Sequence, residues 1–434
     1  MNYLFVDNFR GFSETFTPLQ RANFLVGENS TGKSSLLTLL ALFSTPQFWF
    51  FQDFSPREFS NLGGFNDIVS VASDIRNRFT VGFLNILSEK EQKDQALRYT
   101  FALMTFRNEE GMPKLARYTL YRSEQLLKVL FLPNTTRYKL INQYPNFEQE
   151  DAFLQFVLDV FREDLTDRKG FQQLPESIPP YPPPPLLSAL IQAKDKPKKK
   201  AELTFSAEIP VVLPLTWLAP IRTKPQRTYD GFKTDFTAEG DHTPYVIKKR
   251  LGSRKKAEKL VELVRSFGES SGLFTKVVPH SFGRGPSAPF EVQIELHGAR
   301  LNISNVGYGV SQVLPVVIEM FTRPRGHWFA IQQPEVHLHP RAQASLGELI
   351  HFMVKERQHH YIVETHSEYL IDRFRLRVKD ARGPSGCQVI FFERTKEGNK
   401  IYPIQINEKG QYPQEQPKNF RDFFIREEMR LLEI

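Results

Sequence analysis

The chain has 434 residues, of which 40% are hydrophobic and 24% charged, a composition typical of a soluble globular protein of roughly two to three domains. No window approaches the ~20 consecutive apolar residues that a membrane-spanning helix needs, and the N-terminus is polar where a signal peptide would be apolar. The single cysteine, Cys387, excludes an internal disulfide and a cysteine-based zinc site. We therefore expect a cytoplasmic protein without membrane contact.

The net charge of +8 is concentrated in two basic clusters. The first comprises Lys194, Lys196, Lys198, Lys199 and Lys200, and the second comprises Lys248, Lys249, Arg250, Arg254, Lys255, Lys256 and Lys259. A basic surface attracts nucleic acid or acidic proteins through long-range Coulomb forces. Such runs are more often solvated helix faces or linkers, so nucleic acid is kept as an alternative partner.

The N-terminal part predicts a strand, a loop and a helix in succession. Residues 1–12 are typical of a strand and a turn, and the apolar run Ala22 to Val26 predicts a short strand that ends at Gly27. The leucines that follow predict a helix starting near Lys33. The aromatic segment Phe43 to Phe54 favours core packing over a partner surface, because large aromatic side chains usually mark interiors.

The next part of the chain changes character twice. From Arg78 to about Tyr121, apolar and polar residues alternate, which predicts antiparallel strands with one solvated face in a small β subdomain. An amphipathic helix is expected near Glu148 to Phe161, followed by the run IPPYPPPPLL, which we expect to be extended and exposed. We interpret residues 125–205 as a helical and Pro/Lys-rich insertion, a candidate partner region.

Strands and helices then alternate to the C-terminus. The run VVLPLTWLAPIR predicts a strand, Pro244 to Ser270 a charged helix, and Phe290 to Leu296 and Leu301 to Ser304 two more strands. Beyond Val306 the pattern is α/β: a helix through Ile318, a strand at His327 to Ile331, a helix from Arg341, a strand at Tyr361 to Val363, and a helix after Ser367. The predicted domains are thus residues 1–124 and 206–434, two halves of one α/β head, separated by the insertion.

The strongest chemical signal is a phosphate-loop motif, GxxxxGK[ST], between the predicted strand and the leucine-rich helix. Its residues are Gly27, Glu28, Asn29, Ser30, Thr31, Gly32, Lys33 and Ser34, followed by Ser35. Glycines let successive backbone N–H groups and the helix N-terminus face phosphate oxygens. Lys33 would reach the β and γ oxygens and Ser34 would ligate Mg²⁺, which predicts binding of ATP with Mg²⁺.

Two later strands end in residues that suit the same chemistry. The apolar strand Trp328 to Ile331 runs into Gln332 and Gln333, then PEVHLHP, and the strand at Tyr361 to Val363 runs into ETHS with His366. At a strand end beside a phosphate loop we expect a group that steadies Mg²⁺, a group that positions water, and a histidine that reaches the γ-phosphate. No guanine-reading NKxD motif is present.

These segments resemble motifs of the ABC-type ATPases related to RecF, SMC proteins and the OLD family. PEVHLHP and ETHSEYLI are similar to their Walker B and switch-histidine segments, and NVGYGVSQ to their degenerate signature motif. LAPIRTKPQRTY and INEKGQYPQEQPKNF are also similar to segments of short ATPases in this group. The resemblance implies an ABC-type P-loop head that dimerises or forms larger oligomers around ATP. The signature residues Gly307, Tyr308, Gly309, Ser311 and Gln312 of one protomer would then cap ATP on its partner.

One departure from the family pattern concerns the acids after the Walker B strand. Gln332 and Gln333 stand where relatives have acidic residues, and an amide neither takes a proton nor brings negative charge to Mg²⁺. Three interpretations stay open. In the first, Glu335 is the base, and strand alternation places it on one face with residue 333 unless Pro334 breaks the register. In the second, the glutamines are an engineered change that traps ATP, and in the third the protein is a naturally slow ATPase. We count Gln332, Gln333, Glu335 and His366 as candidate catalytic residues, and Ser34 and Gln332 as candidate metal-side residues.

The resemblance also suggests a biological role. OLD-type nucleases continue into a Toprim domain with acidic metal ligands, and after His366 this sequence predicts a helix, two short strands (Gln388 to Arg394 and Lys400 to Ile406) and a polar tail without a DxD motif. The chain resembles the ATPase subunits of the PARIS and Septu anti-phage systems, which implies an ATP-dependent sensor and scaffold for a separate nuclease or toxin. The alternative is a DNA repair or maintenance ATPase that binds duplex DNA.

Overall fold

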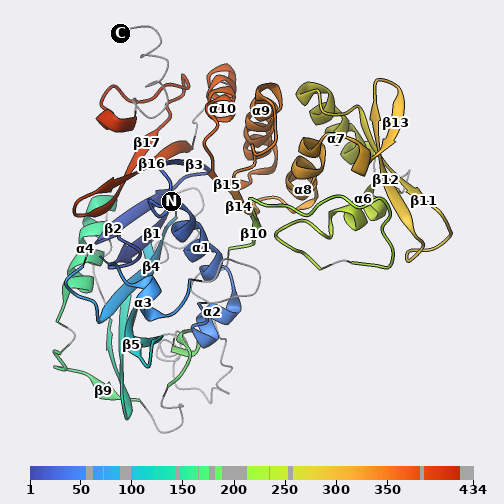
Figure 1. Cartoon of the computed structure of the whole chain (residues 1–434). Coiled ribbons are helices and arrows are strands. Elements are labelled where there is room, and N and C mark those ends of the chain that lie inside the picture. Colours follow the sequence, from blue (N-terminus) through green and yellow to red (C-terminus); the bar gives the residue numbers. More distant parts are fainter. Residues whose placement is uncertain are drawn as a thin grey trace, which may run out of the picture. The chain divides into compact units, whose positions relative to one another are not determined.

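Two sheets of different kinds organise the chain, one antiparallel and one mainly parallel (Figure 1). The computed structural model describes residues 1–54, 62–71, 73–87, 99–122, 124–142, 147, 149–164, 166–174, 181–187, 213–233, 235–252, 258–381 and 386–420. These residues belong to two units. Unit 1 contains residues 1–20, 30–213 and 393–401, and unit 2 contains residues 21–29, 214–392 and 402 onward.

Unit 1 is built on an eight-stranded antiparallel sheet with the order β2-β1-β4-β5-β6-β7-β8-β9. Its strands are β1 (Asn2–Asp7), β2 (Thr15–Leu19), β4 (Arg78–Ile86), β5 (Tyr99–Glu109), β6 (Met112–Arg122), β7 (Gln125–Leu132), β8 (Thr135–Ile141) and β9 (Gln172–Gln173). Its helices are α1 (Lys33–Phe43), α2 (Pro46–Phe51), α3 (Phe65–Ile68) and α4 (Glu150–Arg162). The antiparallel strands expected from the alternating pattern are confirmed.

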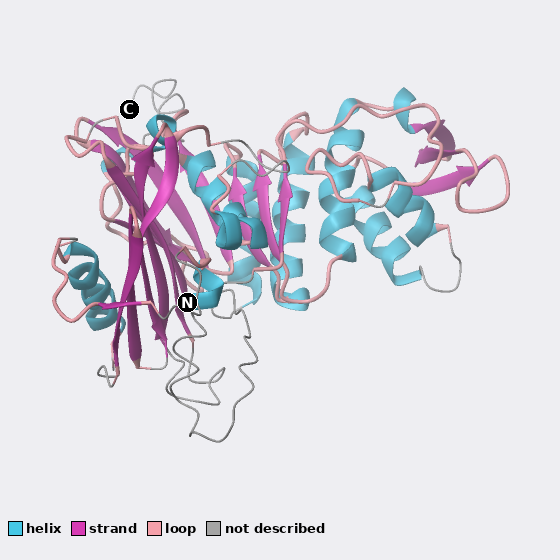
Figure 2. Cartoon of the chain, turned by 90° about the horizontal axis from the view of Figure 1, so that it is seen from below, coloured by secondary structure: helices cyan, strands magenta, loops and turns pink. Residues whose placement is uncertain are grey.

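Helix α4, expected near residues 148–161, lies along one face of this sheet (Figure 2). Phe153, Val157 and Val160 recur at intervals of four and three residues, so they form one apolar stripe, and all three are buried. The ring of Phe153 lies 4.7 Å from that of Tyr99 on β5. The helix therefore covers the core of the sheet with the face that its sequence pattern indicates.

The aromatic segment after α1 is mostly core, as expected. Phe48 and Trp49 in α2 are fully buried, and the indole N–H of Trp49 donates to the carbonyl of Phe43 at 2.7 Å. Phe51, however, is 77% exposed. The core interpretation thus holds for the first turn of α2, and the end of the helix presents an aromatic side chain to solvent.

The expected extended and exposed conformation of the proline run is wrong for its described part. Residues 184–187 are helical, and Pro182, Pro184 and Pro185 are buried. The Tyr181 hydroxyl donates to the carbonyl of Leu132 at 2.6 Å, which attaches the run to the end of β7. Proline rings are apolar, so a run of them can pack against a sheet once one polar contact fixes its start.

Unit 2 is built on a six-stranded sheet with the order β10-β14-β15-β3-β16-β17, in which β10, β14, β15, β3 and β16 pair in parallel. Its strands are β10 (Leu215–Leu218), β14 (Trp328–Gln332), β15 (His360–Glu364), β3 (Ala22–Gly27), β16 (Cys387–Thr395) and β17 (Gly398–Gln405). Residues 393–395 of β16 and 398–401 of β17 belong to unit 1. The helices are α6 (Thr243–Leu251), α7 (Glu258–Ser271), α8 (Tyr308–Thr322), α9 (Pro340–Arg357) and α10 (Glu368–Ala381), with a 3-10 turn η2 (Ile303–Asn305). The expected α/β fold class with an antiparallel β subdomain is confirmed.

A second, three-stranded sheet in unit 2 consists of β11 (Lys276–Ser281), β12 (Phe290–Leu296) and β13 (Ala299–Asn302), paired antiparallel. The single charged helix expected from Pro244 to Ser270 is instead two helices, α6 and α7, with residues 253–257 outside the described part. Gly252 is the C-cap residue of α6. Both helices pack their buried residues into the unit 2 core.

The parallel strands and helices of unit 2 share one continuous apolar core. Cys387, at the start of β16, is buried in this core at 2% exposure. Helices α9 and α10 lie side by side (Figure 1), and they are close together at Gly347, where an added Cβ would lie 2.0 Å from the carbonyl oxygen of Leu370.

We expect Gly347→Ala to destabilise the protein by about 1–3 kcal/mol, which is the usual cost of overpacking a close contact. The carbonyl of Leu370 belongs to the backbone, so α10 must move to admit a methyl group. Chemical denaturation of the variant measures this directly. Gly307→Ala is the matched control, since nothing lies within 4 Å of the position a Cβ would take there. Equal stability of the two variants would contradict the close approach.

Candidate active site

The phosphate loop begins at the carboxyl end of β3, an inner strand of the parallel sheet between β15 and β16. Every residue of β3 is buried. At Gly27 φ is +143°, and a Cβ there would lie 2.3 Å from the carbonyl oxygen of Phe392 on β16. The motif glycine is therefore required by both its backbone conformation and the neighbouring strand. Glu28 and Asn29 follow it in unit 2.

In unit 1 the loop turns into α1. Ser30 and Gly32 have φ values of +62° and +94°, and a Cβ on Gly32 would collide with the ring of Phe12 at 2.5 Å. Helix α1 begins at Lys33, whose side chain is buried, with Ser34 and Ser35 in its first turn. Successive N–H groups at a helix N-terminus attract phosphate, so the curled loop and the helix start have the form that the motif predicts. Arg394, which the sequence did not single out, donates to the carbonyl of Ser30 at 3.0 Å. Thr31 completes the loop and is buried.

The carboxyl ends of β14 and β15 lie side by side in unit 2. In the parallel register Gln332 pairs with Glu364, and Glu364 pairs with Leu25 of β3. The Gln332 amide donates to a carboxylate oxygen of Glu364 at 3.0 Å. Glu364 is 6% exposed, and we did not predict it as a site residue. The signal that could have found it is a carboxylate at a strand end next to the phosphate-loop strand.

Glu335 lies in a turn after β14, and the strand-alternation argument for it is wrong. The strand ends at Gln332, and Gln333 adopts a left-handed conformation with φ +42° while its N–H donates to the carbonyl of Glu364 at 2.7 Å. The turn nevertheless places one carboxylate oxygen of Glu335 2.7 Å from the backbone N–H of His366. Glu335 and the backbone of His366, both predicted site residues, are thus brought together by the fold.

The electrostatic surroundings of Glu335 favour a base. Burial raises the pKa of this carboxyl, and the hydrogen bond from the His366 N–H and the charge of Arg222 oppose part of that rise. Its second oxygen is buried, and a side-chain hydrogen bond from Thr365 also lowers the pKa. A buried carboxylate with a raised pKa is suited to take a proton.

Arg222, in the loop after β10, is the buried cation next to this carboxylate. It is 2% exposed, and burial lowers its pKa to about 10, while the charge of Glu335 acts in the opposite direction. One guanidinium nitrogen donates to the carbonyl of Gln332 at 3.2 Å. The side-chain amide of Gln312 donates to the Arg222 carbonyl at 3.5 Å. Arg222 therefore contacts both the end of β14 and helix α8.

The predicted signature residues gather at the N-terminal turns of α8. Gly307 precedes the helix with open space around it, and the exposed ring of Tyr308 packs edge-on against His337 with ring centroids 4.9 Å apart. Gly309 permits close packing, since a Cβ there would lie 2.6 Å from the His337 carbonyl oxygen. The Ser311 hydroxyl donates to the Tyr308 carbonyl at 2.8 Å. The signature turn is thus packed on the turn that carries Glu335.

Few side chains of the described residues could ligate Mg²⁺. Among the described residues no group of three or more His, Cys, Asp or Glu side chains could hold a metal ion. Mg²⁺ usually keeps several waters and takes one or two carboxylates together with nucleotide phosphates, so such a cluster is not required. Ser34 in unit 1 and the carboxylates of Glu335 and Glu364 in unit 2 are of the donor type that Mg²⁺ prefers, whereas the amides of Gln332 and Gln333 bring no negative charge.

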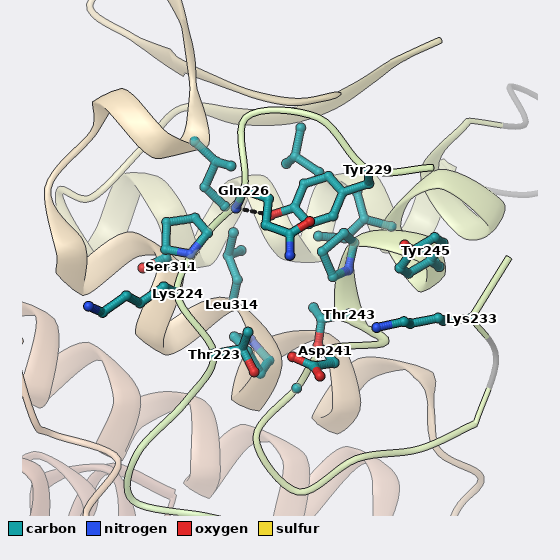
Figure 3. A pocket seen from close by; sticks show the side chains of 17 residues that line it. Thr223, Lys224, Gln226, Tyr229, Lys233, Asp241, Thr243, Tyr245, Ser311 and Leu314 are labelled. Carbon is teal, nitrogen blue, oxygen red and sulfur yellow. Dashed lines mark hydrogen bonds between the residues drawn. The ribbon is translucent and has the colours of Figure 1, made fainter. Parts of the chain in front are cut away.

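A cavity of about 160 Å³ lies beside helix α8 (Figure 3). Its walls include Gln226, Tyr229 and Thr243 from the segment after Arg222 and the start of α6, and Ser311 and Leu314 from α8. The Tyr229 hydroxyl accepts from the backbone N–H of Gln226 at 3.0 Å, which fixes one wall. Small-molecule sites are usually about 300–1,000 Å³, so we assign no ligand to this cavity.

The second basic cluster is partly structural. The ammonium of Lys248 donates to the carbonyls of Pro286 and Ala288 at 2.8 and 2.7 Å and lies 4.7 Å above the ring of Phe290. Lys249 and Arg250 are exposed in the last turn of α6, where cations are favoured by the helix dipole. Residues 254–256 and the whole first cluster lie outside the described residues.

Residues 22–372 match a family model described as "AAA domain, putative AbiEii toxin, Type IV TA system". The chain belongs to this family. The match begins at the phosphate-loop strand and ends within α10, so it includes every candidate site residue named above. No curated protein matches the chain. In the described part no helix combines the length and the apolar composition that crossing a membrane requires.

Solved structures similar to the chain include SMC head domains. The head domain from Thermotoga maritima is 11% identical, with a TM-score of 0.39, and the alignment covers 93% of this chain and 98% of that one. A head domain with an extended coiled coil, bound to the C-terminal domain of ScpA derived from Pyrococcus furiosus, is 12% identical with a TM-score of 0.38, covering 100% and 99%. An SMC head bound to the C-winged helix domain of ScpA is 12% identical with a TM-score of 0.39, covering 93% and 97%. The family assignment rests on the sequence match alone.

Proposed function

We propose that this protein is an ABC-type ATPase that binds Mg²⁺-ATP at its phosphate loop and pairs two protomers around the nucleotide. The observation that carries the proposal is the grouping of Glu335 and His366 at the strand ends of the parallel sheet that also holds the phosphate-loop strand. Membership in an AAA family supports nucleotide use. The exposed Tyr308 and the open space around Gly307 support a signature turn that is free to cap ATP on a second protomer.

In this proposal Glu335 is the general base. Its second oxygen would take the proton of the attacking water, while the hydrogen bond from the His366 N–H holds its first oxygen in place. Lys33 would supply positive charge to the β and γ oxygens, and Mg²⁺ would supply further charge neutralisation when bound. Gln332 and Gln333 would hold Glu364 in place, through the side-chain amide of Gln332 and the backbone N–H of Gln333. ATP hydrolysis can therefore proceed without acids at positions 332 and 333.

We further propose that the ATPase cycle senses infection and holds a separate effector, a nuclease or a toxin, in bacterial anti-phage defence. The family description, which names a toxin of a type IV toxin-antitoxin system, supports this class of role over membrane transport. The exposed Phe51 at the end of α2 offers an apolar contact in unit 1. The DNA repair or maintenance alternative rests on the basic clusters, of which Lys249 and Arg250 are exposed.

The mass of the protein in solution tests the pairing. We expect light scattering on a sizing column to give a larger mass with Mg²⁺-ATP than without nucleotide, and Lys33→Ala to abolish the increase together with ATP binding. A mass that does not change in saturating Mg²⁺-ATP would refute the pairing. Salt-resistant co-purification of a second polypeptide supports the scaffold role, whereas duplex DNA binding that weakens steeply with salt supports the repair alternative.

The pH dependence of hydrolysis tests the surroundings of Glu335. As a base Glu335 works when ionised, so kcat should fall as the pH drops through its raised pKa, at a higher pH than for an ordinary glutamate. Arg222→Met removes the charge that lowers this pKa, so the acid limb should move to still higher pH. Arg222→Lys keeps the charge and should leave the limb closer to that of the wild type. An acid limb that is the same in all three proteins would contradict the role of Arg222.

A further inference from the structure

A cavity of about 450 Å³ lies within unit 1, beside the C-terminal end of α4. Its volume falls in the range of about 300–1,000 Å³ that is usual for small-molecule sites. Phe5 on β1 packs against Phe161 on α4 with ring centroids 5.1 Å apart, and Asp7 is two residues further along the strand. Because side chains alternate across a strand, Asp7 lies on the α4 face of the sheet, and both Asp7 and Phe161 line the cavity. The described lining residues include none of the phosphate loop.

The Asp7 carboxylate in this cavity lacks a counter-charge in contact with it. One of its oxygens accepts from the Ser13 hydroxyl at 3.4 Å and from the Glu14 backbone N–H at 3.1 Å. Within the described part of the chain Asp7 forms no ion pair, and its other oxygen has no hydrogen bond. Burial raises the pKa of this carboxyl, and the positive charge of Arg78 has the smallest of the opposing effects. Asp7 therefore has room and reason for a cationic partner.

A second acceptor without a partner belongs to Asn8, which also lines the cavity and is 5% exposed. Its amide N–H groups donate to the carbonyls of Ile75 and Arg78, which are two further lining residues. These contacts hold the amide end of the side chain at the cavity wall. The amide oxygen is buried and has no hydrogen-bond partner among the residues that the structure describes. A buried acceptor without a partner costs free energy that a donor on a ligand would recover.

The other polar side chains of the cavity are hydroxyls or members of ion pairs. The hydroxyls of Thr80 and Thr105 are buried and share a hydrogen bond of 2.9 Å. Glu14 is paired with Arg162 at 2.5 Å, so these two charges offset each other. Glu163 is paired with two cations that do not line the cavity. The interior is therefore rich in acceptors, and its unpaired charge at Asp7 is negative.

An organic cation suits this cavity better than a metal ion or an anion. In the described part of the chain no group of three or more His, Cys, Asp or Glu side chains could hold a metal ion. Ile75 and Phe161 add apolar wall against which a carbon chain can pack. Arg78 also lines the cavity, but its side chain is exposed, so it can turn toward solvent when a cation enters.

We propose that this cavity binds a small aliphatic amine, whose ammonium group pairs with Asp7 and donates to the amide oxygen of Asn8. The amine supplies the counter-charge that Asp7 lacks and the donor that Asn8 lacks, and its carbon chain lies against Phe161. The ligand joins β1, the start of β4 and the end of α4, so it stabilises unit 1. This inference goes beyond the proposed nucleotide chemistry and does not depend on ATP binding.

Titration calorimetry without nucleotide tests the site, with putrescine as the amine and butanediol of the same carbon chain as the neutral control. The wild type should bind putrescine and not butanediol. Asp7→Asn should weaken putrescine binding by at least about tenfold, because the hydrogen bond from the ammonium group loses its charged acceptor. The Asn oxygen can still accept from Ser13 and Glu14, so the fold is kept. Arg78→Met removes a repelling charge and should strengthen binding.

The matched control is Asp151→Asn, which makes the same change at an exposed position in the first turn of α4 and should bind putrescine like the wild type. A wild type that binds no putrescine, or binds butanediol equally well, would overturn the site. Equal affinities of the wild type and a folded Asp7→Asn would overturn the role of Asp7, and loss of binding in Arg78→Met would show that the cavity takes an anionic group instead. Circular dichroism shows whether each variant is folded.

A lysine side chain of a partner protein carries the same ammonium group as a free amine. Acetyl-lysine methylamide, acetylated on the α-amino group, presents that group on a peptide unit and distinguishes the two sources. Putrescine should bind more tightly than this lysine derivative, because a peptide unit has to stay outside an enclosed site of this volume. Tighter binding of the lysine derivative would overturn the assignment to a free amine.

Discussion

Glu335→Gln should slow ATP hydrolysis by ~10²–10⁴-fold, the usual cost of losing a general base, and leave ATP binding close to that of the wild type. The substitution is nearly isosteric, and an amide oxygen can still accept from the His366 N–H as the carboxylate does. Single-turnover kinetics with saturating Mg²⁺-ATP measure the chemical step, and equilibrium binding measures the affinity. The stalled variant should also hold the ATP-dependent pair for longer.

A matched control for this variant is Glu356→Gln, which neutralises an exposed glutamate near the end of α9. It should hydrolyse ATP at the wild-type rate. If Glu335→Gln also hydrolyses at the wild-type rate, Glu335 is not the base and another group must accept the proton. If both variants are equally slow, the effect comes from lost negative charge in general.

Mixing two inactive variants should restore hydrolysis. Lys33→Ala removes nucleotide binding from its own loop but keeps a normal signature turn. Gly307→Glu keeps the loop but adds a bulky negative group at the signature turn, where open space and an ordinary φ let the protomer accept it. A mixed pair contains one site with both an intact loop and an intact signature turn. We expect each variant alone to be nearly inactive. An equimolar mixture should regain up to about a quarter of wild-type turnover. Random pairing makes half of the pairs mixed, and each mixed pair has one working site of two.

The mixture distinguishes pairing from action within one chain. If the signature turn served only its own protomer, no combination of the two variants would contain a complete site, and the mixture would stay inactive. Gly307→Ala mixed with Lys33→Ala controls for the methyl group alone. Activity of Gly307→Glu on its own, at the wild-type level, would show that this turn does not approach the nucleotide at all.

The sequence predicted the parts of the site that depend on local pattern. The phosphate loop, the strand that precedes it and the helix from Lys33 follow from glycine spacing and an apolar run, and they lie where expected. The ends of β14 and β15 follow from two short apolar strands. These features need only neighbouring residues, so one sequence was sufficient to find them.

What the sequence did not predict depends on pairs of residues far apart in the chain. The contact of Gln332 with Glu364 requires the register of two strands, and Arg222 acquires its place only when β10 pairs with β14. The position of Glu335 was argued from strand alternation, which fails because Gln333 adopts a left-handed conformation. The proline run was misjudged because its composition does not reveal that Tyr181 attaches it to β7.

The lone thiol of Cys387 gives this protein a built-in reporter of folding. A thiol-reactive dye cannot reach it while β16 stays paired with β3, so the labelling rate measures how often that part of the sheet opens. Because β3 leads into the phosphate loop, a nucleotide that steadies the loop should slow labelling. No cysteine has to be removed before a second one is introduced on the surface as an attachment point for spectroscopic probes.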